Sequence, residues 1–133
     1  MVAIVGAGPI GNYTGYLFAK EGYKTKIFEE HNVIGKPIQC TGITTVYLGK
    51  ILENIGSNED FVVNNINETL VYGPDGKYVD IKLKRNYIVD RTMFDSYFGE
   101  LAESAGAEVI CGKRFVDFKK NNGNMLLKFK DES

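Results

Sequence analysis

The sequence has 133 residues, of which 44% are hydrophobic and 25% are charged, and its formal net charge is −1. This is the composition of one ordinary globular domain, and it argues against a polybasic surface for nucleic acid. No apolar run reaches the length of about 18 residues that a transmembrane helix needs. The start of the sequence lacks the basic and apolar regions of a signal peptide, and its two cysteines do not form a disulfide framework. We therefore expect a cytoplasmic protein with reduced thiols.

The first predicted element is a strand at residues 2–5, which is apolar at every position and should be buried on both faces. A turn follows, with Gly6, Gly8 and Gly11 in the spacing Gly-x-Gly-x-x-Gly. Gly6 allows a sharp turn, Gly8 allows a pyrophosphate to approach the backbone, and Gly11 allows the next helix to pack closely on the strand. The spacing therefore predicts a turn that binds the phosphates of a dinucleotide.

A helix is predicted at residues 10–21, because apolar side chains recur there at helical spacing until Gly22 ends the pattern. A second strand, at residues 24–29, should lie parallel to the first through a right-handed crossover. It ends in Glu29, at the position where a carboxylate accepts hydrogen bonds from a ribose diol. These features together predict a Rossmann-like unit, which suits either FAD or NAD.

The remainder of the chain begins with a long loop at residues 31–45, and long ordered loops are more often functional than idle. Beyond it the sequence predicts an antiparallel hairpin or meander, a second long helix, a further parallel strand and a C-terminal β-hairpin. The expected ranges are a helix at 45–55, strands between 61 and 83 and at 86–90, a helix at 91–105, a strand at 107–111, and hairpin strands at 114–119 and 125–130. The predicted fold class is α/β, with a parallel sheet and an antiparallel insertion.

Three stretches resemble one family, the mostly archaeal FAD-dependent geranylgeranyl reductases within the p-hydroxybenzoate hydroxylase superfamily. The first is Val5-Gly6-Ala7-Gly8-Pro9-Ile10-Gly11 with Ile27-Phe28-Glu29, which many dinucleotide-binding proteins share. The second is Ile34-Gly35-Lys36-Pro37-Ile38-Gln39-Cys40-Thr41-Gly42, and the third is Tyr87-Ile88-Val89-Asp90-Arg91-Thr92-Met93-Phe94-Asp95. The second and third stretches are much more specific to the family than the first.

The resemblance implies FAD as the cofactor, NAD(P) as an external reductant, and an isoprenoid lipid whose carbon–carbon double bonds are reduced. It also implies a role for the residues at matching positions, none of them a catalytic acid or base or a metal ligand. The implied sites are the pyrophosphate at Gly6, Gly8, Ile10 and Gly11, the ribose at Glu29, the flavin side at Cys40, Thr41 and Gly42, a phosphate or ribityl contact at Arg91, and the adenine at the backbone of Phe115.

Members of that family are considerably longer, and they carry a Gly-Asp motif that binds the flavin side of FAD and a β-sheet substrate domain. Neither feature is found in this sequence. We therefore expect residues 1–133 to be an FAD/NAD(P)-binding domain, the N-terminal portion of a larger flavoprotein without its substrate domain. Such a chain is a gene fragment, an expressed domain or one half of a two-chain enzyme, is inactive alone, and contacts a membrane only peripherally.

Two alternatives to this interpretation stay open. One is a truncated, non-enzymatic dinucleotide-binding domain, and the other is an NAD(P)-dependent dehydrogenase domain. Single residues also have plainer interpretations: Cys40 as an uncharged loop residue, Cys111 as a core residue, and His31 as a solvated loop histidine. Glu29 is the stronger ribose candidate, whereas Glu30 should point the opposite way into solvent because successive strand residues alternate.

Overall fold

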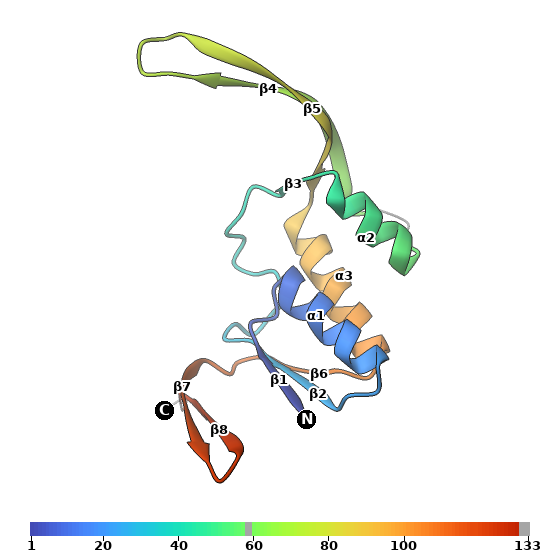
Figure 1. Cartoon of the computed structure of the whole chain (residues 1–133), viewed down its shortest axis with the longest axis vertical. Helices are drawn as coiled ribbons and strands as arrows, with labels where there is room; N and C mark the ends of the chain where they lie inside the picture. Colours follow the sequence, from blue (N-terminus) through green and yellow to red (C-terminus); the bar gives the residue numbers. More distant parts are fainter. Residues whose placement is uncertain (58–59, 131–133) are drawn as a thin grey trace. The chain divides into compact units, whose positions relative to one another are not determined.

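The computed structural model describes residues 1–57 and 60–130, apart from the side chain of Arg85. The chain divides into two compact units. The first unit consists of Met1–Ile38 with Thr92–Ser133, and the second consists of Gln39–Arg91. The elements of each unit are labelled in Figure 1.

The first unit is built on a parallel sheet of β1 (Val2–Val5), β2 (Thr25–Phe28) and β6 (Glu108–Ile110), in the order β1-β2-β6. Helix α1 (Pro9–Lys20) connects β1 to β2, and α3 (Arg91–Ser104) precedes β6. The predicted strand–turn–helix–strand unit and the later return to the parallel sheet are therefore confirmed.

Small residues let both helices approach the sheet closely, and α1 and α3 cover the same face of it (Figure 1). Ile27, at the centre of β2, is fully buried, and a Cβ on Gly15 would overlap its side chain. The buried residues of this core come from both helices, from β2 and from the connecting turns, and they are Ala7, Ala19, Ile27, Ala102 and Ala107. Gly15 in α1 thus has the packing role expected of glycine at a close helix–strand contact.

The prediction that β1 is buried on both faces is wrong. Ile4 packs against the helix-side core, but the next residue, Val5, is 52% exposed. Helices cover only one face of this sheet within the described ranges, so the strand alternates between half-buried and exposed positions. On the second face, the ring of Phe28 meets the ring of Phe129 at a centroid distance of 4.6 Å.

Phe129 belongs to the predicted C-terminal hairpin, which is formed by β7 (Phe115–Asn121) and β8 (Asn124–Phe129). Both residues of its turn have positive φ, 47° at Asn122 and 80° at Gly123. This is the type I′ geometry that an Asn-Gly pair favours, because its twist matches that of the two strands. The hairpin prediction is therefore confirmed.

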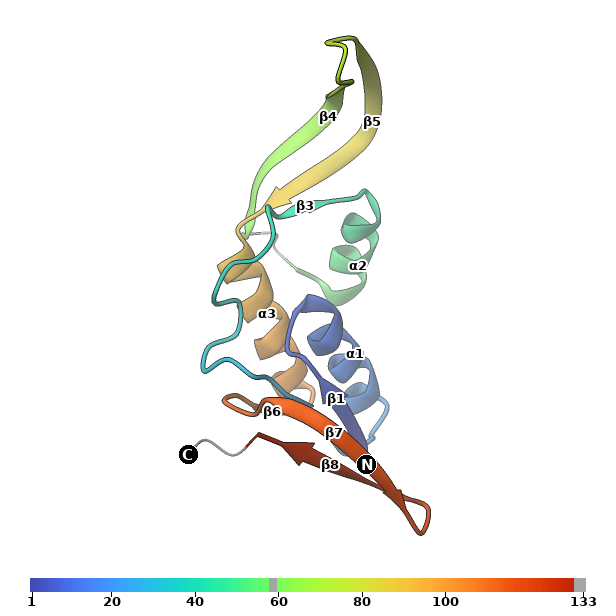
Figure 2. The same ribbon diagram turned by 90° about the vertical axis from the view of Figure 1, so that its left-hand side faces the viewer.

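The second unit holds α2 (Tyr47–Ile55) and an antiparallel sheet. The order of the sheet is β3 (Ile43–Thr44), β5 (Tyr78–Val89) and β4 (Val62–Tyr72). The predicted antiparallel insertion is confirmed, but its division into several short strands is wrong. Strands β4 and β5 form one long twisted ribbon, seen in Figure 2.

Two register shifts explain why the sequence misled here. One falls between Val62 and Asn64, where Val63 is the extra residue on β4, and the other falls between Ile66 and Glu68, where the extra residues are on β5. Bulges absorb such residues without ending the strand pairing. The core of the second unit lies near the C-terminal end of β5. Its buried hydrophobic residues are Leu48, Leu52, Phe61, Tyr87 and Val89.

Candidate dinucleotide-binding site

The glycine turn at the end of β1 has the conformation that its sequence predicted. Gly6 has a φ of 96°, and its N–H donates to the carbonyl oxygen of Phe28 at 2.7 Å, which ties the turn to β2. A Cβ on Gly11 would overlap the carbonyl oxygen of Gly6, so only glycine fits there. A Cβ on Gly8 would meet no protein atom within 4 Å. The space beside Gly8 is therefore open to a ligand.

Helix α1 presents its N-terminus at this turn. Gly8 is the N-cap residue, Pro9 occupies the first turn, and the N–H of Asn12 donates to the carbonyl of Gly8 at 2.9 Å. The backbone N–H groups of Ile10 and Gly11 precede that bond and so have no acceptor within the helix. The first turn also carries no acidic side chain. Since the positive end of the helix dipole lies here, the arrangement suits an anion such as a pyrophosphate.

Asn12 is a residue of this site that the sequence reasoning missed. It is fully buried, and its Nδ2 donates to the carbonyl oxygen of Ala7 at 2.7 Å, which joins the first turn of α1 to the glycine turn. In the part of the chain that is described, its Oδ1 is buried without a hydrogen-bond partner. The apolar pattern that begins at Ile10 had assigned a different face of the helix to the core, and that assignment is wrong, because Asn12, Gly15 and Ala19 are buried while Ile10 is exposed.

Glu29 follows β2, and three N–H groups hold its carboxylate. Oε2 accepts at 2.8 Å from the N–H of Ala7, which belongs to the glycine turn. Oε1 accepts from the N–H of His31 at 3.0 Å and lies 2.6 Å from the ring Nδ1 of His31. The side chain of Glu29 is only 13% exposed. The carboxylate is thus fixed against the turn that would receive the phosphates.

These hydrogen bonds decide the charge of Glu29. Burial alone would raise the pKa of its carboxyl, but the bonds from the backbone of His31, the backbone of Ala7 and the ring of His31 outweigh burial and lower that pKa. Glu29 is therefore ionised at neutral pH. A carboxylate accepts about four hydrogen bonds, so one acceptor position beyond these three remains for a ligand hydroxyl.

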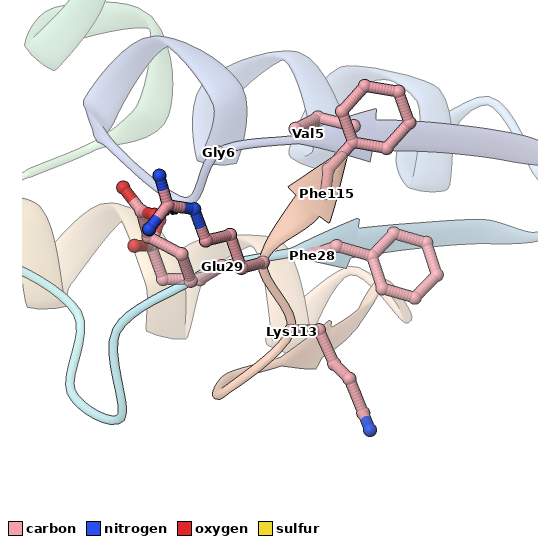
Figure 3. Close-up of a pocket in the computed structure, with 8 residues that line it drawn as sticks. Val5, Gly6, Phe28, Glu29, Lys113 and Phe115 are labelled. Atoms are coloured by element: carbon pink, nitrogen blue, oxygen red, sulfur yellow. Dashed lines mark ion pairs between the residues drawn. The ribbon is translucent and has the colours of Figure 1, made fainter. Parts of the chain in front are cut away.

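A cavity of about 170 Å³ adjoins Glu29, and Figure 3 shows its lining. The lining residues are Val5, Gly6, Phe28, Glu29, Glu30, Lys113, Arg114 and Phe115. Pockets that enclose a whole small-molecule ligand measure about 300–1,000 Å³. This cavity therefore has room for one end of a dinucleotide only, next to the carboxylate.

The outer part of the cavity carries charge. Arg114 Nε lies 3.4 Å from a carboxylate oxygen of Glu30, and both side chains are about half exposed or more, so the pair is well solvated. The prediction that Glu30 points to solvent while Glu29 turns inward is confirmed. Lys113 extends away from the other labelled side chains in Figure 3, but its backbone N–H donates to the carbonyl of Glu29 at 2.7 Å.

The structure brings three of the predicted site residues, Gly6, Glu29 and Phe115, around this one cavity. Gly8, Ile10 and Gly11 form the turn and the start of α1. His31 corrects the sequence interpretation, because it is bonded to Glu29 rather than merely solvated.

The other predicted site residues lie in the second unit. Gly42 is buried with a φ of 80°, and its carbonyl accepts from the N–H of Val89 at 2.9 Å. A Cβ on Gly42 would overlap the carbonyl oxygen of Val89 and lie 3.5 Å from Cγ of Arg91, so the backbone of Gly42 and the stem of Arg91 are neighbours. Cys40 and Thr41 precede this contact and are exposed.

Fold and glycine turn together define a Rossmann-like α/β domain. The family described as NAD(P)-binding Rossmann-like domain matches residues 4–45, which include the glycine turn, α1, β2 and Glu29. The fold class predicted from the sequence is confirmed by this match and by the parallel sheet.

The chain is similar, more particularly, to digeranylgeranylglycerophospholipid reductases. It is 31% identical to the reductase of Methanocaldococcus jannaschii over 98% of this chain and 34% of the relative. It is 30% identical to the reductase of Thermoplasma acidophilum over 93% of this chain and 33% of the relative. The resemblance predicted from three sequence stretches is thus confirmed, and the chain spans about a third of the length of these curated relatives.

Solved structures agree with this placement. A geranylgeranyl bacteriochlorophyll reductase-like protein from Thermoplasma acidophilum matches 96% of this chain with a TM-score of 0.81 and 28% identity, over 34% of its own length. A flavin-dependent brominase matches 99% of this chain with a TM-score of 0.78, but at 20% identity it shows the fold alone. None of the helices in the described ranges combines the length and apolar character of a membrane span.

Proposed function

We propose that this chain is the FAD-binding part of an oxidoreductase that reduces the isoprenoid double bonds of lipids. The observation that carries the proposal is the inward-facing carboxylate of Glu29, held by the N–H of Ala7 beside the cavity. It stands where a ribose would follow a pyrophosphate seated on Gly8 and the start of α1. The residues of the first unit therefore fit the adenosine end of a dinucleotide.

Several residues would share the binding of FAD. The turn at Gly6, Gly8, Ile10 and Gly11 would receive the pyrophosphate, Glu29 would accept a ribose hydroxyl, and Phe115 would offer its backbone to the adenine. In the second unit, we propose that Cys40, Thr41 and Gly42 meet the flavin side and that Arg91 binds a phosphate or the ribityl chain. The contact between the buried Gly42 backbone and the Arg91 stem supports treating them as one structural group.

The homologues support the choice of reaction. Their name identifies them as reductases of digeranylgeranylglycerophospholipid, an isoprenoid lipid. Bound FAD would supply the hydride chemistry, while this chain would bind and orient the cofactor. Because the chain spans about a third of these relatives, we propose that residues 1–133 are one FAD-binding domain and that further polypeptide, in the same or a second chain, completes the enzyme. NAD(P)H would act as the external reductant, in the cytoplasm and peripherally at the membrane that holds the lipid.

The proposal is tested by titrating the purified chain with FAD, ADP and NADH by calorimetry and by absorbance of the bound flavin. We expect FAD to bind more tightly than NADH, and Glu29→Gln to weaken both FAD and ADP by about tenfold, since a charge-assisted hydrogen bond is weakened. Glu68→Gln, an exposed acid of the β4–β5 ribbon, is the matched control and should bind as the wild type does. A chain that binds no adenine dinucleotide would overturn the proposal.

A second candidate is an NAD(P)-dependent dehydrogenase domain. It is favoured by the match of residues 4–45 to the NAD(P)-binding Rossmann-like family, since the glycine turn and Glu29 suit NAD as well as FAD. The same titration separates the two, because this candidate requires NADH to bind more tightly than FAD. Binding of ADP with no preference for FAD would instead indicate a non-enzymatic domain that holds only the adenosine half.

A further inference from the structure

His31 contacts the site carboxylate in two ways. Its backbone N–H donates to Oε1 of Glu29 at 3.0 Å, and its ring Nδ1 lies 2.6 Å from the same oxygen. A carboxylate is an acceptor only, so Nδ1 must carry the proton in this contact. The imidazole therefore donates to Glu29 through Nδ1.

The backbone around His31 is fixed independently of the ring. The carbonyl of His31 accepts from the N–H of Gly112 at 3.0 Å. On the other side of the same segment, the N–H of Glu29 donates to Ile110 and the carbonyl of Glu29 accepts from Lys113. These bonds tie residues 29–31 to the last residue of β6 and to the segment that follows it. The ring thus reaches the carboxylate from a backbone that hydrogen bonds hold in place, unlike the ring of a histidine in a free surface loop.

The three donors occupy the two oxygens unequally. Both His31 groups reach Oε1, while Oε2 has the single bond from Ala7. An ionised carboxylate has about two acceptor positions on each oxygen. The remaining position is therefore on Oε2, the oxygen nearest the glycine turn. If the ring were removed, Oε1 would lose one of its two donors, and only the backbone N–H groups of Ala7 and His31 would hold the carboxylate.

We propose that His31 is a positioning residue for adenine nucleotides, whose ring donor holds Glu29 so that Oε2 receives one hydroxyl of the adenosine ribose. This inference rests on the proposed function and deepens it, because it concerns how the same site recognises the sugar. The ring itself need not touch the ligand. Its effect should therefore depend on the ribose hydroxyls and be absent when the ligand lacks them.

The experiment measures binding of ADP and of 2′,3′-dideoxy-ADP to the 133-residue chain by calorimetry. In the wild type, ADP should bind about tenfold more tightly than the dideoxy analogue, since Glu29 meets a hydroxyl only in ADP. His31→Ala should weaken ADP about three- to tenfold and leave the analogue unchanged. His31→Asn, which keeps an amide donor close to the position of Nδ1, should restore most of the lost affinity for ADP.

Val33→Ala is the matched control, because Val33 is exposed in the same segment, and it should behave as the wild type does. Equal weakening of both ligands by His31→Ala would indicate a general structural role and would overturn the inference, as would no weakening of either. A wild type that fails to bind both ligands overturns the proposed function itself. NMR titration of Glu29 in the ligand-free chain adds a second readout, because His31→Ala should raise the pKa of Glu29. An unchanged pKa would show that the ring does not hold the carboxylate.

Discussion

The two units of the chain differ in where their apolar side chains lie. In the first unit, two helices and a parallel sheet enclose a core around the fully buried Ile27. In the second unit, the buried residues gather near α2, and the far part of the β4–β5 ribbon leaves Val71 and Val79 53% and 63% exposed. Val71 and Val79 face each other across the two strands. In this part of the ribbon the strands therefore pair without covering these side chains, whereas the first unit combines strand pairing with helix–sheet packing.

The units also differ in how they hold charge. In the ribbon, the ammonium of Lys82 pairs with Glu68 and Asp80 among exposed side chains, which bulk solvent screens. In the first unit, Glu29 is held mainly by N–H groups at a position that is mostly buried. A carboxylate held by an anchored backbone keeps one orientation, which ligand recognition requires. The contrast shows that the fixed carboxylate lies in the first unit, whereas the exposed ion pairs lie in the second.

The largest expected effects come from truncating one buried residue in each unit. Ile27→Ala and Leu52→Ala each remove a side chain that is at most 1% exposed, and each should cost about 2–5 kcal/mol. Because the units are separately compact, we expect Leu52→Ala to lower the hydrogen-exchange protection of amides in Gln39–Arg91 by about thirtyfold or more. Protection around Ile27 should change little in that variant.

The reciprocal variant is the control for this comparison. Ile27→Ala should loosen the parallel sheet and leave the amides of β4 and β5 near their wild-type protection. Equal loss of protection across both units in either variant would show that the chain unfolds as one cooperative body. The two units would then share one free energy of unfolding.

The next largest effects come from substitutions in the glycine turn of the first unit. Gly11→Ala places a Cβ against the carbonyl oxygen of Gly6 and should cost about 3 kcal/mol, because a backbone atom must move. Gly8→Ala meets no protein atom and should cost about 1 kcal/mol or less, mostly from the weaker N-cap. Thermal unfolding measures both. Yet Gly8→Ala should weaken ADP binding, and a variant with wild-type affinity would contradict a pyrophosphate seated there.

Features set by short-range spacing could be predicted from the sequence. Gly6, Gly8 and Gly11 imply their turn because each needs a particular backbone freedom, and Asn122-Gly123 implies its hairpin for the same reason. Glu29 could be identified as the inward-facing acid because strand residues alternate. Each of these inferences depends on only a few neighbouring positions.

Features set by partners distant in the sequence could not be predicted. The bond from Ala7 to Glu29 spans 22 positions, and nothing near Glu29 signals it. His31 looked like a solvated loop residue, since the bonds that anchor its backbone come from residues beyond β6. The exposure of Val5 depends on which face of the sheet the helices cover, and a uniformly apolar strand does not reveal that.

A smaller effect, that of pH and salt, distinguishes Glu29 in the first unit from Glu68 in the β4–β5 ribbon. The pKa of Glu29 lies below its ordinary value of 4.5, so its contribution to stability is complete above that value and is lost as the pH falls through the lowered folded pKa. The pKa of Glu68 is also lowered, by its hydrogen bond to Lys82 and by the charge of that side chain. In 1 M salt the shift of the exposed Glu68 should shrink, while that of Glu29 should largely persist.

NMR titration of the two carboxyl groups at low and high salt measures this difference. Glu29→Gln should remove part of the loss of stability expected as the pH falls below 4.5, whereas Glu68→Gln should remove little of it. Equal sensitivity of both pKa values to salt would mean that Glu29 is held by charge rather than by fixed N–H donors. The electrostatic contrast between the units would then be wrong.

The smallest effect concerns the two cysteines, one in each unit. Burial raises the pKa of the Cys111 thiol, and the negative charges of Glu29 and Glu103 raise it further, so little of Cys111 is thiolate at pH 7.5. Cys40 is exposed in the second unit. Iodoacetamide should therefore alkylate Cys40 several-fold faster than Cys111, as peptide mass spectrometry would show, and Cys40→Ser isolates the slower reaction.

Glu103→Gln should accelerate the alkylation of Cys111 by about twofold or less, since it removes only the last of the three causes of the raised pKa. In guanidinium the two rates should converge, and a Cys111 that reacts as fast as Cys40 in the folded chain would show that the fold of the first unit does not protect its thiol.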